Sequence, residues 1–209
     1  MKRPSIYELC TKYRVNVKGI VQIGAHKGQE VEQFLRLKPN KILLIEAIPY
    51  LADELREKFS ANSKIKVISC AISDYNGKAK FNIIADDGRC SSLFNLKAHL
   101  KLYPDIKKTD EIDVECKRLD TLLEEINETP QHYNYLNMDV QGAEYFALQG
   151  AANLLKHIDA IYTEISYVEL YENYVLEPQL TEFLKKNGFE KKEESLLRPV
   201  WGDAFYVRT

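Results

Sequence analysis

Residues 19–28 read Gly-Ile-Val-Gln-Ile-Gly-Ala-His-Lys-Gly, a short apolar run followed by a turn with glycines at positions 24 and 28. Glycine allows the backbone to approach a ligand closely, and the helix pattern that follows would present free N–H groups to that ligand. The same spacing also occurs in a tight strand-to-helix turn that binds nothing. Of these two interpretations we favour the ligand-binding turn.

Apolar runs and helical patterns alternate along most of the chain. Further strand patterns lie at 41–45, 65–70, 133–138 and 158–165, and helices are expected at 28–38, 49–59, 119–126, 142–155 and 177–187. This alternation indicates βαβ units and a parallel sheet buried on both faces. Residues 189–195 and 203–208 form two strand patterns with no helix between them, which predicts that they are antiparallel neighbours.

The length fits one domain over residues 1–209. Residues 1–18 are expected to be an N-terminal extension with a helix at 5–14, for which Ser5 is the candidate N-cap. Residues 78–84 alternate between polar and apolar side chains, as an edge strand does, and 112–117 is a further strand pattern. The residues from 85 to 111 have no regular pattern and are interpreted as a flap over the site.

Composition excludes several classes of protein. Lys and Arg total 29 against 31 Asp and Glu, a net charge of −2, so no nucleic-acid partner is expected, because duplex-binding proteins have a strong basic excess. No window approaches the roughly 18 apolar residues of a membrane span. The four cysteines form no Cys-x-x-Cys pair and have no histidine at ligand spacing, which predicts no zinc site and no disulfide framework and fits a cytoplasmic protein. No metal site is expected, since no dedicated ligand spacing is present, and a metal held by the oxygen ligands of Asp139 and Glu164 is the open alternative.

Glu46 follows the second strand pattern, 18 residues after Gly28. In nucleotide-binding α/β folds an acidic side chain at this place accepts hydrogen bonds from the ribose hydroxyls. The plainer alternative is a solvated charge at the end of a strand. Because open parallel sheets bind ligands at the carboxyl ends of their strands, the glycine turn and Glu46 together favour a nucleotide-type cofactor.

An ordered set of motifs resembles the FkbM-type S-adenosylmethionine-dependent methyltransferases. Its pieces are Gly24 to Gly28, Glu46-Ala47-Ile48-Pro49, Ala71-Ile72-Ser73-Asp74 with Gly77, Ser91-Ser92-Leu93, Leu119-Asp120-Thr121-Leu122 and Met138-Asp139-Val140-Gln141-Gly142-Ala143-Glu144. The resemblance covers residues 19–208. It implies a doubly wound, Rossmann-like α/β methyltransferase fold with a seven-stranded, mostly parallel sheet whose last strand is antiparallel.

The resemblance also implies S-adenosyl-L-methionine as the cofactor. The implied cofactor-binding residues are Gln22, Gly24, Ala25, His26, Gly28, Glu46, Ala47, Ala71, Ile72, Ser73 and Asp139. Among them, Glu46 would hold the ribose hydroxyls and Asp139 would sit beside the transferred methyl group. Three positions depart from the family's usual pattern: Gln22 stands where aspartate is frequent, His26 where asparagine is common, and Gln141 where glutamate is frequent.

Asp139 and Glu164 are the candidate catalytic residues, because both follow apolar strands at the ligand-facing edge. Methyl transfer requires donor and acceptor in line, and a hydroxyl acceptor needs a base to remove its proton. Asp139 is the first candidate for this base. Carboxylates at strand ends also cap neighbouring helices, and for Glu164 that structural role is as well supported as the catalytic one.

Tyr167, Tyr171 and Tyr174 are spaced as one face of a helix. We favour a packed stripe for them, and the alternative is an aromatic surface for a sugar ring. Members of the resembled family often act on glycans, which implies O-methylation of a sugar or glycan hydroxyl. For His26 and His99, which could also reach the site, a packing or surface role is favoured.

The sequence is also compatible with three other functions. The chain could methylate a small molecule that is not a sugar. A NAD-dependent oxidoreductase would also use Glu46, but it normally has glycine where this chain has His26. The third alternative is a binding module without catalysis. Such a module would tolerate the loss of Asp139, yet Asp139 is present in this chain.

Overall fold

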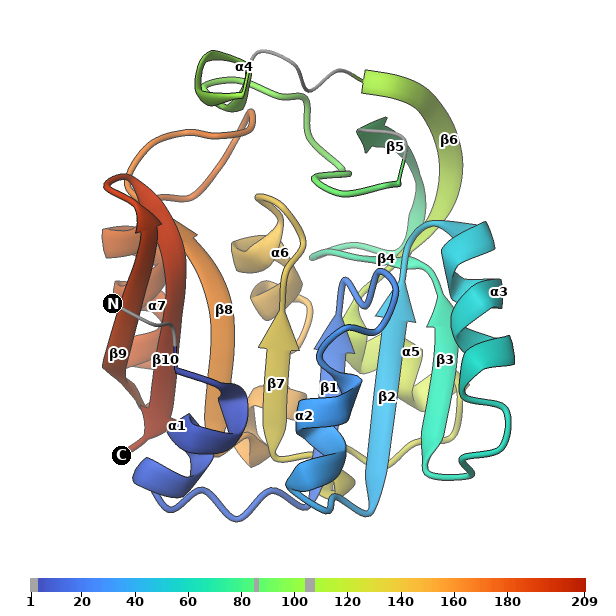
Figure 1. The fold of residues 1–209 in the computed structure, drawn as a ribbon, viewed down its shortest axis with the longest axis vertical. Coiled ribbons are helices and arrows are strands. Elements are labelled where there is room, and N and C mark those ends of the chain that lie inside the picture. Colours follow the sequence, from blue (N-terminus) through green and yellow to red (C-terminus); the bar gives the residue numbers. More distant parts are fainter. Residues whose placement is uncertain (1–3, 85–86, 104–107) are drawn as a thin grey trace.

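A seven-stranded sheet forms the centre of the molecule (Figure 1). The computed structural model describes residues 4–84, 87–103 and 108–209. In spatial order the strands are β3 (Ile65–Ser69), β2 (Lys41–Glu46), β1 (Gly19–Ile23), β7 (Tyr135–Met138), β8 (Ala160–Ser166), β10 (Trp201–Arg208) and β9 (Phe189–Arg198). The strands from β3 to β8 pair in parallel, whereas β10 is antiparallel to both β8 and β9. The predicted fold class and the antiparallel last strand are confirmed.

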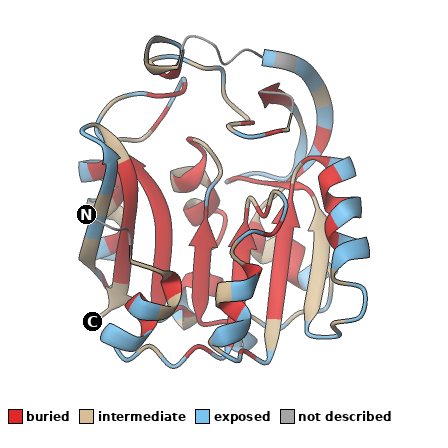
Figure 2. Cartoon of the chain, in the orientation of Figure 1, coloured by how far each residue is buried: buried red, intermediate tan, exposed pale blue. Residues whose placement is uncertain are grey.

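Both faces of the sheet are buried, as the mainly apolar strand patterns predict. Alternate residues of β1 enter separate cores: Val21 and Ile23 lie in one, and Ile20 lies in the other. Figure 2 shows the central strands buried along their length. The helices that contribute to the first core are α5 (Leu119–Glu125), α6 (Glu144–Gln149) and α7 (Glu177–Lys186), and those that contribute to the second are α1 (Ile6–Lys12), α2 (Val31–Arg36) and α3 (Pro49–Lys58).

The ends of the first helices follow from local sequence signals. Ser5 caps α1 as predicted: its hydroxyl accepts the backbone N–H of Glu8 at 3.2 Å, and the Glu8 carboxylate accepts the backbone N–H of Ser5 at 2.7 Å. Pro49 opens α3, where a missing N–H costs nothing. The described part of the chain contains no helix that is both long and apolar enough to cross a membrane.

A second, three-stranded sheet has the order β4 (Ala71–Ile72), β6 (Lys108–Lys117) and β5 (Gly77–Ile84). Strand β6 begins earlier than the pattern at 112–117 indicates. Of the predicted flap, residues 85–86 and 104–107 lie outside the described residues. The rest contains the short helix α4 (His99–Leu102) and an irregular segment that joins β5 through a bridge between Asn82 and Ser92. Whether this segment moves as a flap stays a prediction, as does the single-domain boundary.

The helix predicted over 142–155 is shorter than expected. Helix α6 ends at Gln149 with Gly150 as its C-cap, and a 3₁₀ turn, η2 (Leu154–His157), follows it. A Cβ at Gly150 would lie 2.1 Å from the carbonyl oxygen of Ser73, so the backbone passes too close to the residue after β4 for anything but glycine to occupy this position. The carboxylate of Asp120 then accepts the backbone N–H groups of Asn153 and Leu154, which starts the new turn.

The helix expected from the spacing of Tyr167, Tyr171 and Tyr174 is wrong, because residues 167–176 form an irregular loop. Backbone hydrogen bonds hold this loop to the segment before α4, such as Glu172 N–H to Asn95 O at 2.9 Å. Tyr171 and Tyr174 are buried in their own cluster, as the packing interpretation requires. Tyr167 turns away from them toward Glu194.

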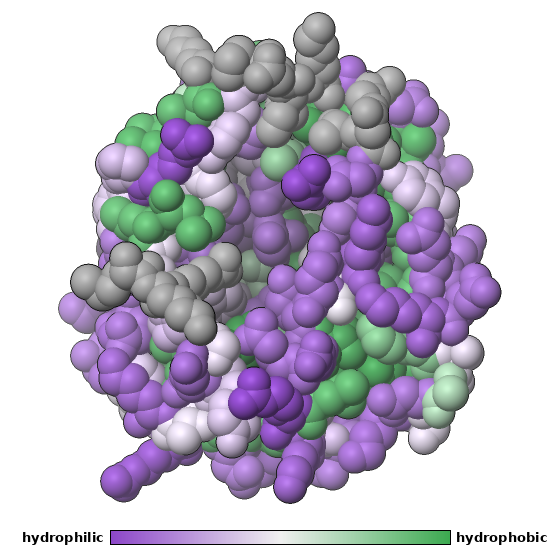
Figure 3. Space-filling view, in the orientation of Figure 1, coloured by the Kyte–Doolittle hydropathy of each residue, from purple (hydrophilic) through white to green (hydrophobic). Residues whose placement is uncertain are grey.

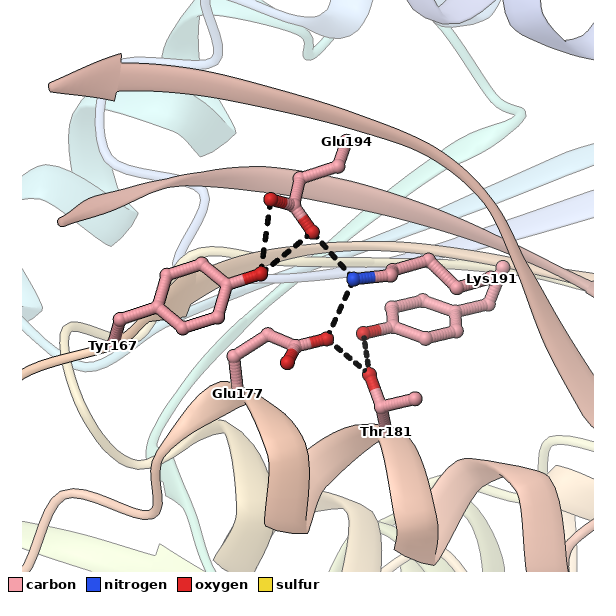
Figure 4. A network of polar contacts seen from close by, with 6 residues as sticks. Tyr167, Glu177, Thr181, Lys191 and Glu194 are labelled. Carbon is pink, nitrogen blue, oxygen red and sulfur yellow. Dashed lines mark hydrogen bonds and ion pairs between the residues drawn. The ribbon is translucent and has the colours of Figure 1, made fainter. Parts of the chain in front are cut away.

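A polar network fixes the loop and α7 against β9 (Figure 4). The Lys191 ammonium donates to Glu177 at 2.7 Å and also to Glu194. Thr181 donates to Glu177 at 2.6 Å, and the Tyr167 hydroxyl lies 2.9 Å from both oxygens of Glu194. Glu177 is buried, so this ion pair is shielded from solvent and holds the β9–β10 hairpin in place.

Candidate active site

A cavity of about 440 Å³ lies at the carboxyl ends of β1, β2, β7 and β8. The antiparallel strand β10 begins at the same edge, because Trp201 pairs with Ser166 at the end of β8. Figure 3 shows this face of the molecule hollowed above the sheet. Topology therefore brings side chains from both halves of the sheet to one place.

Most of the residues singled out in the sequence meet at this cavity. Gln22, Gly24, His26, Glu46, Ala47, Ala71, Ile72, Asp139 and Glu164 line it. Ala25, Gly28 and Ser73 do not. Ala25 is fully buried in the second core, and a Cβ at Gly28 would meet Phe59 at 2.9 Å, so Ala25 and Gly28 support the turn from behind.

The glycine turn needs Gly24 for a steric reason. Its φ is +78°, and a Cβ there would lie 1.9 Å from the carbonyl oxygen of Asp139. His26, also at positive φ, directs its Nε2 to the carbonyl oxygen of Asp87 at 2.7 Å, while its Nδ1 lies 2.7 Å from Nε2 of Gln29. Because a carbonyl only accepts, Nε2 carries the hydrogen and Nδ1 accepts from the amide. His26 thus joins the turn to residues 87–91.

Glu46 is the residue that holds the turn to the next strand. Its Oε2 accepts the backbone N–H of His26 at 2.7 Å and its Oε1 accepts that of Ile48 at 2.9 Å. The side chain is only 5% exposed, and this burial raises its pKa against the opposing effect of the two N–H donors. Each carboxylate oxygen has a second lone pair, so Glu46 can still accept from a ligand.

Gln22 presents an acceptor at the cavity. Its Nε2 donates to Glu30 Oε2 at 3.1 Å, whereas its buried Oε1 finds no hydrogen-bond partner in the part of the chain that the structure describes. A buried acceptor without a partner is unfavourable, so a ligand donor at this position would be stabilised. Gln22 therefore keeps a hydrogen-bond acceptor at this position, where the resembled family frequently has aspartate.

Gln141 joins the two candidate catalytic carboxylates. Its Nε2 donates to Asp139 Oδ1 at 2.5 Å and lies 3.3 Å from Glu164 Oε2, and its Oε1 accepts the hydroxyl of Tyr171 at 2.6 Å. Burial and the neighbouring carboxylates of Asp139, Glu144 and Asp203 raise the pKa of Glu164 well above its usual value. These surroundings favour the protonated form of Glu164 relative to that of an exposed carboxyl group.

Glu144 orders the loop between β7 and α6. Its two oxygens accept the backbone N–H groups of Val140 and Gly142, each at 3.0 Å. The side chain is buried, which raises its pKa to about 7. The sequence placed Glu144 in a motif but gave it no role. Its position five residues after Asp139, at the first position of a helix, is the signal that could have identified it.

The open side of the cavity is covered by residues that the sequence did not single out as a group. Gly88, Arg89, Cys90, Ser91 and Leu93 come from the predicted flap, and His99, Tyr103, Leu170, Leu197, Trp201 and Asp203 come from α4, the 167–176 loop and the β9–β10 hairpin. The Ser92 hydroxyl donates to the carbonyl oxygen of Gln141 at 2.7 Å, which fixes the first of these segments to the catalytic loop. No group of three or more His, Cys, Asp or Glu side chains among residues 4–84, 87–103 and 108–209 is arranged to hold a metal ion.

Comparison with known proteins gives a consistent family. The Methyltransferase FkbM domain matches residues 22–191. The 2-O-methyltransferase NoeI of Sinorhizobium fredii is 32% identical over 160 residues, which cover 73% of this chain and 65% of NoeI. The chain therefore spans about two thirds of the length of that relative.

Solved structures show the same fold. The FkbM methyltransferase of Methylobacillus flagellatus has a TM-score of 0.58 at 12% identity, over 92% of this chain and 44% of that one. The putative tRNA (m1A22) methyltransferase Sp1610 of Streptococcus pneumoniae, solved in complex with S-adenosyl-L-methionine, has a TM-score of 0.50 at 12% identity, over 97% of this chain and 71% of that one. At these identities the likeness concerns the fold alone.

Proposed function

The chain belongs to the FkbM methyltransferase family, and from that premise we propose that it transfers a methyl group from S-adenosyl-L-methionine to a hydroxyl oxygen of a sugar in a glycan or glycoconjugate. The observation that carries the proposal is the meeting of Glu46 and Asp139, from two different strands, at one cavity. Glu46 is suited to accepting hydrogen bonds from the ribose hydroxyls of the cofactor, and Asp139 is suited to removing the proton of the acceptor hydroxyl.

The charge of the cavity supports this donor. Five carboxyl-bearing residues line it: Glu30, Glu46, Asp139, Glu164 and Asp203. The guanidinium that also lines it, on Arg89, is paired with Asp87 at 2.7 Å. A ligand with a sulfonium and an ammonium group is favoured in such surroundings. When bound, it supplies an electrophilic methyl group.

The residues around the glycine turn fit the rest of the cofactor. Glu46 would accept from the ribose hydroxyls, and the unpartnered Oε1 of Gln22 would accept from the amino group. Ala71 and Ile72 offer apolar contact for the adenine.

Asp139 is the proposed general base. It follows β7 and faces the cavity, and the amide of Gln141 donates to its Oδ1, which favours the ionised form and fixes its rotamer. Burial and the neighbouring carboxylates raise the pKa of Glu164, which favours its protonated form and makes it better suited than Asp139 to donating a hydrogen bond. The two carboxyl groups thus have different roles because their surroundings differ.

Two observations support a neutral hydroxyl acceptor. The relative NoeI is named as a 2-O-methyltransferase. The carboxylate of Asp139, the proposed base, also disfavours an anionic acceptor, since a phosphate or carboxylate would have to approach it.

The proposal is tested by incubating the protein with S-adenosylmethionine and a panel of neutral glycans and methyl glycosides, with mass spectrometry of the products. The expected result is a gain of one methyl group on at least one sugar, lost when Asp139 is replaced by Asn. If no hydroxylated sugar gains mass, the sugar acceptor is rejected, and methylation of a non-sugar molecule becomes the better account.

A further inference from the structure

The cavity has two halves that are separated by the end of β7. Strands β1 and β2, with the glycine turn and Glu46, lie on one side of β7, and strands β8, β10 and β9 lie on the other. Asp139 stands at the boundary. The half of the cavity on the β8 side of β7 is lined by residues that have no proposed contact with the cofactor, namely His99, Tyr103, Leu170, Leu197 and Trp201.

These side chains come from segments far apart in the sequence and meet above the sheet edge. In Figure 1, α4 and the loop after β8 lie over the end of the β9–β10 hairpin. The 167–176 loop joins them, because the backbone N–H groups of Lys97 and His99 both donate to the carbonyl oxygen of Leu170. The wall is therefore built by tertiary contacts and not by one flexible segment.

Two polar atoms of this wall lack a protein partner. His99 is 5% exposed, and its Nδ1 has no hydrogen-bond partner within the described residues. The same is true of the indole Nε1 of Trp201. An indole N–H can only donate, and a buried donor without an acceptor is unfavourable. Both residues line the cavity, so a ligand there can supply the missing partners.

The remainder of the wall is apolar and aromatic. The His99 ring lies between the rings of Tyr103, at 4.8 Å between centroids, and Tyr171, at 5.5 Å. The guanidinium of Arg198 is already placed over the Tyr103 ring at 5.0 Å, and its Nε donates to the Tyr103 hydroxyl. Leu197, 49% exposed, forms the outer edge. Burial lowers the pKa of His99, so its imidazole is neutral near pH 7.

We propose that His99, Tyr103, Leu197 and Trp201 form the acceptor subsite, and that it takes an uncharged, hydroxylated ring whose apolar face packs on the aromatic wall while its hydroxyls bond His99 and Trp201. This inference rests on the proposed methyl transfer and adds to it the location and charge of the acceptor. A sugar ring has the required combination of an apolar face and peripheral hydroxyls. An anionic ring would instead meet the carboxyl group of Asp203 at the same end of the cavity.

Trp201 provides a direct test, because it is the only tryptophan in the chain. The intact protein, saturated with S-adenosylhomocysteine, is titrated with methyl glycosides of neutral hexoses and 6-deoxyhexoses, and the indole emission is followed together with calorimetry. Methyl glucuronide is the matched anionic probe. We expect a saturable change in emission with at least one neutral glycoside and none with the glucuronide.

Two variants separate a subsite from simple packing. His99→Phe keeps the ring between the two tyrosines but removes both ring nitrogens, and it should weaken glycoside binding by about tenfold, the effect of one lost hydrogen bond. Tyr167→Phe is the control, because its hydroxyl bonds Glu194 outside the cavity, and it should bind the glycoside as the unaltered protein does.

The outcomes distinguish this inference from the proposed function. If a glycoside binds by calorimetry without changing the Trp201 emission, or binds His99→Phe as tightly as the unaltered protein, the acceptor subsite lies elsewhere even if methyl transfer occurs. If none of the neutral glycosides binds, the inference is also overturned. Failure of S-adenosylhomocysteine to bind would instead contradict the proposed function itself.

Discussion

The carboxylate of Glu46 accepts the backbone N–H of His26, with 2.7 Å between the nitrogen and Oε2. The residue that sequence reasoning assigns to a ribose therefore also holds the glycine turn in shape. Its other oxygen fixes the start of α3 through Ile48. Ligand binding and local order are linked at this side chain, so a change at Glu46 should affect both.

Replacing Glu46 by Gln should weaken S-adenosylhomocysteine binding by at least about tenfold and lower stability by about 1–3 kcal/mol. The amide has only one oxygen, so one of the two backbone N–H groups would face an NH₂ group. Thermal melts with and without S-adenosylhomocysteine measure both effects. Glu57→Gln, at an exposed position of α3, is the matched control. An unchanged ligand-induced shift in Glu46→Gln would contradict the assignment.

Asp139→Asn should abolish most of the turnover while it retains cofactor binding. Asparagine keeps the size of the side chain and an oxygen that can accept from Gln141, but it cannot take a proton. Loss of a general base costs about 10²–10⁴ in rate. Methyl-transfer rates and calorimetry with S-adenosylhomocysteine measure the two properties, with exposed Asp53→Asn as the control. Full activity in Asp139→Asn would remove Asp139 as the base.

Gln141→Glu should move the acidic limb of the kcat/KM profile to higher pH by about one unit or more. The new carboxyl would lie beside Asp139 and Glu164, and its negative charge disfavours ionisation of the base. It would also lose the amide donor that now bridges them. Gln179→Glu, at an exposed position of α7, makes the same charge change far from the base and should leave the profile as it is. Superimposable profiles for all three proteins would show that Gln141 does not tune the pair.

Stability should fall as the pH rises from about 4.5 to about 7, because folding raises the pKa of the Glu144 carboxyl to about 7 from its ordinary 4.5. In this interval the unfolded chain has lost the proton that the folded protein keeps, so the free energy of unfolding decreases by about 1.4 kcal/mol per pH unit for one such group. Glu164, with its raised pKa, acts in the same direction.

Urea unfolding across this pH range measures the slope. Glu144→Gln should be less stable at low pH, because one of the N–H groups of Val140 and Gly142 loses its acceptor, but its stability should depend less on pH. Glu124→Gln, exposed on α5, is the control and should keep the original slope. Identical slopes in Glu144→Gln and Glu124→Gln would contradict the raised pKa.

The sheet could be predicted because its signals are local. Runs such as 19–23 and 41–45 are apolar except for one polar residue each, Gln22 and Lys41, and this pattern is typical of a strand that is covered on both faces. The glycine turn and Glu46 could also be predicted locally, because each directly follows one of these strand patterns. The pattern over 142–155 does not show that α6 ends at Gln149, because the contacts that begin the next turn join Asp120 to Asn153 and Leu154, far away in the sequence.

The half of the cavity on the β8 side of β7 could not be predicted from local sequence patterns. Tyr167, Tyr171 and Tyr174 have helical spacing, yet their backbone is held to residues 95–99 by contacts that no local pattern records. His99 and Trp201 lie about a hundred residues apart and meet only because β10 runs antiparallel and begins at the site edge. Tertiary pairing, and not local preference, positions these residues.

The central claim is that the cavity binds an S-adenosyl cofactor at the glycine turn. Isothermal titration calorimetry of the unaltered protein with S-adenosylhomocysteine, and separately with NAD, tests it most directly. The account predicts saturable binding of S-adenosylhomocysteine at one site and no binding of NAD. Binding of NAD together with no heat from S-adenosylhomocysteine would contradict the account and favour a nicotinamide-dependent oxidoreductase.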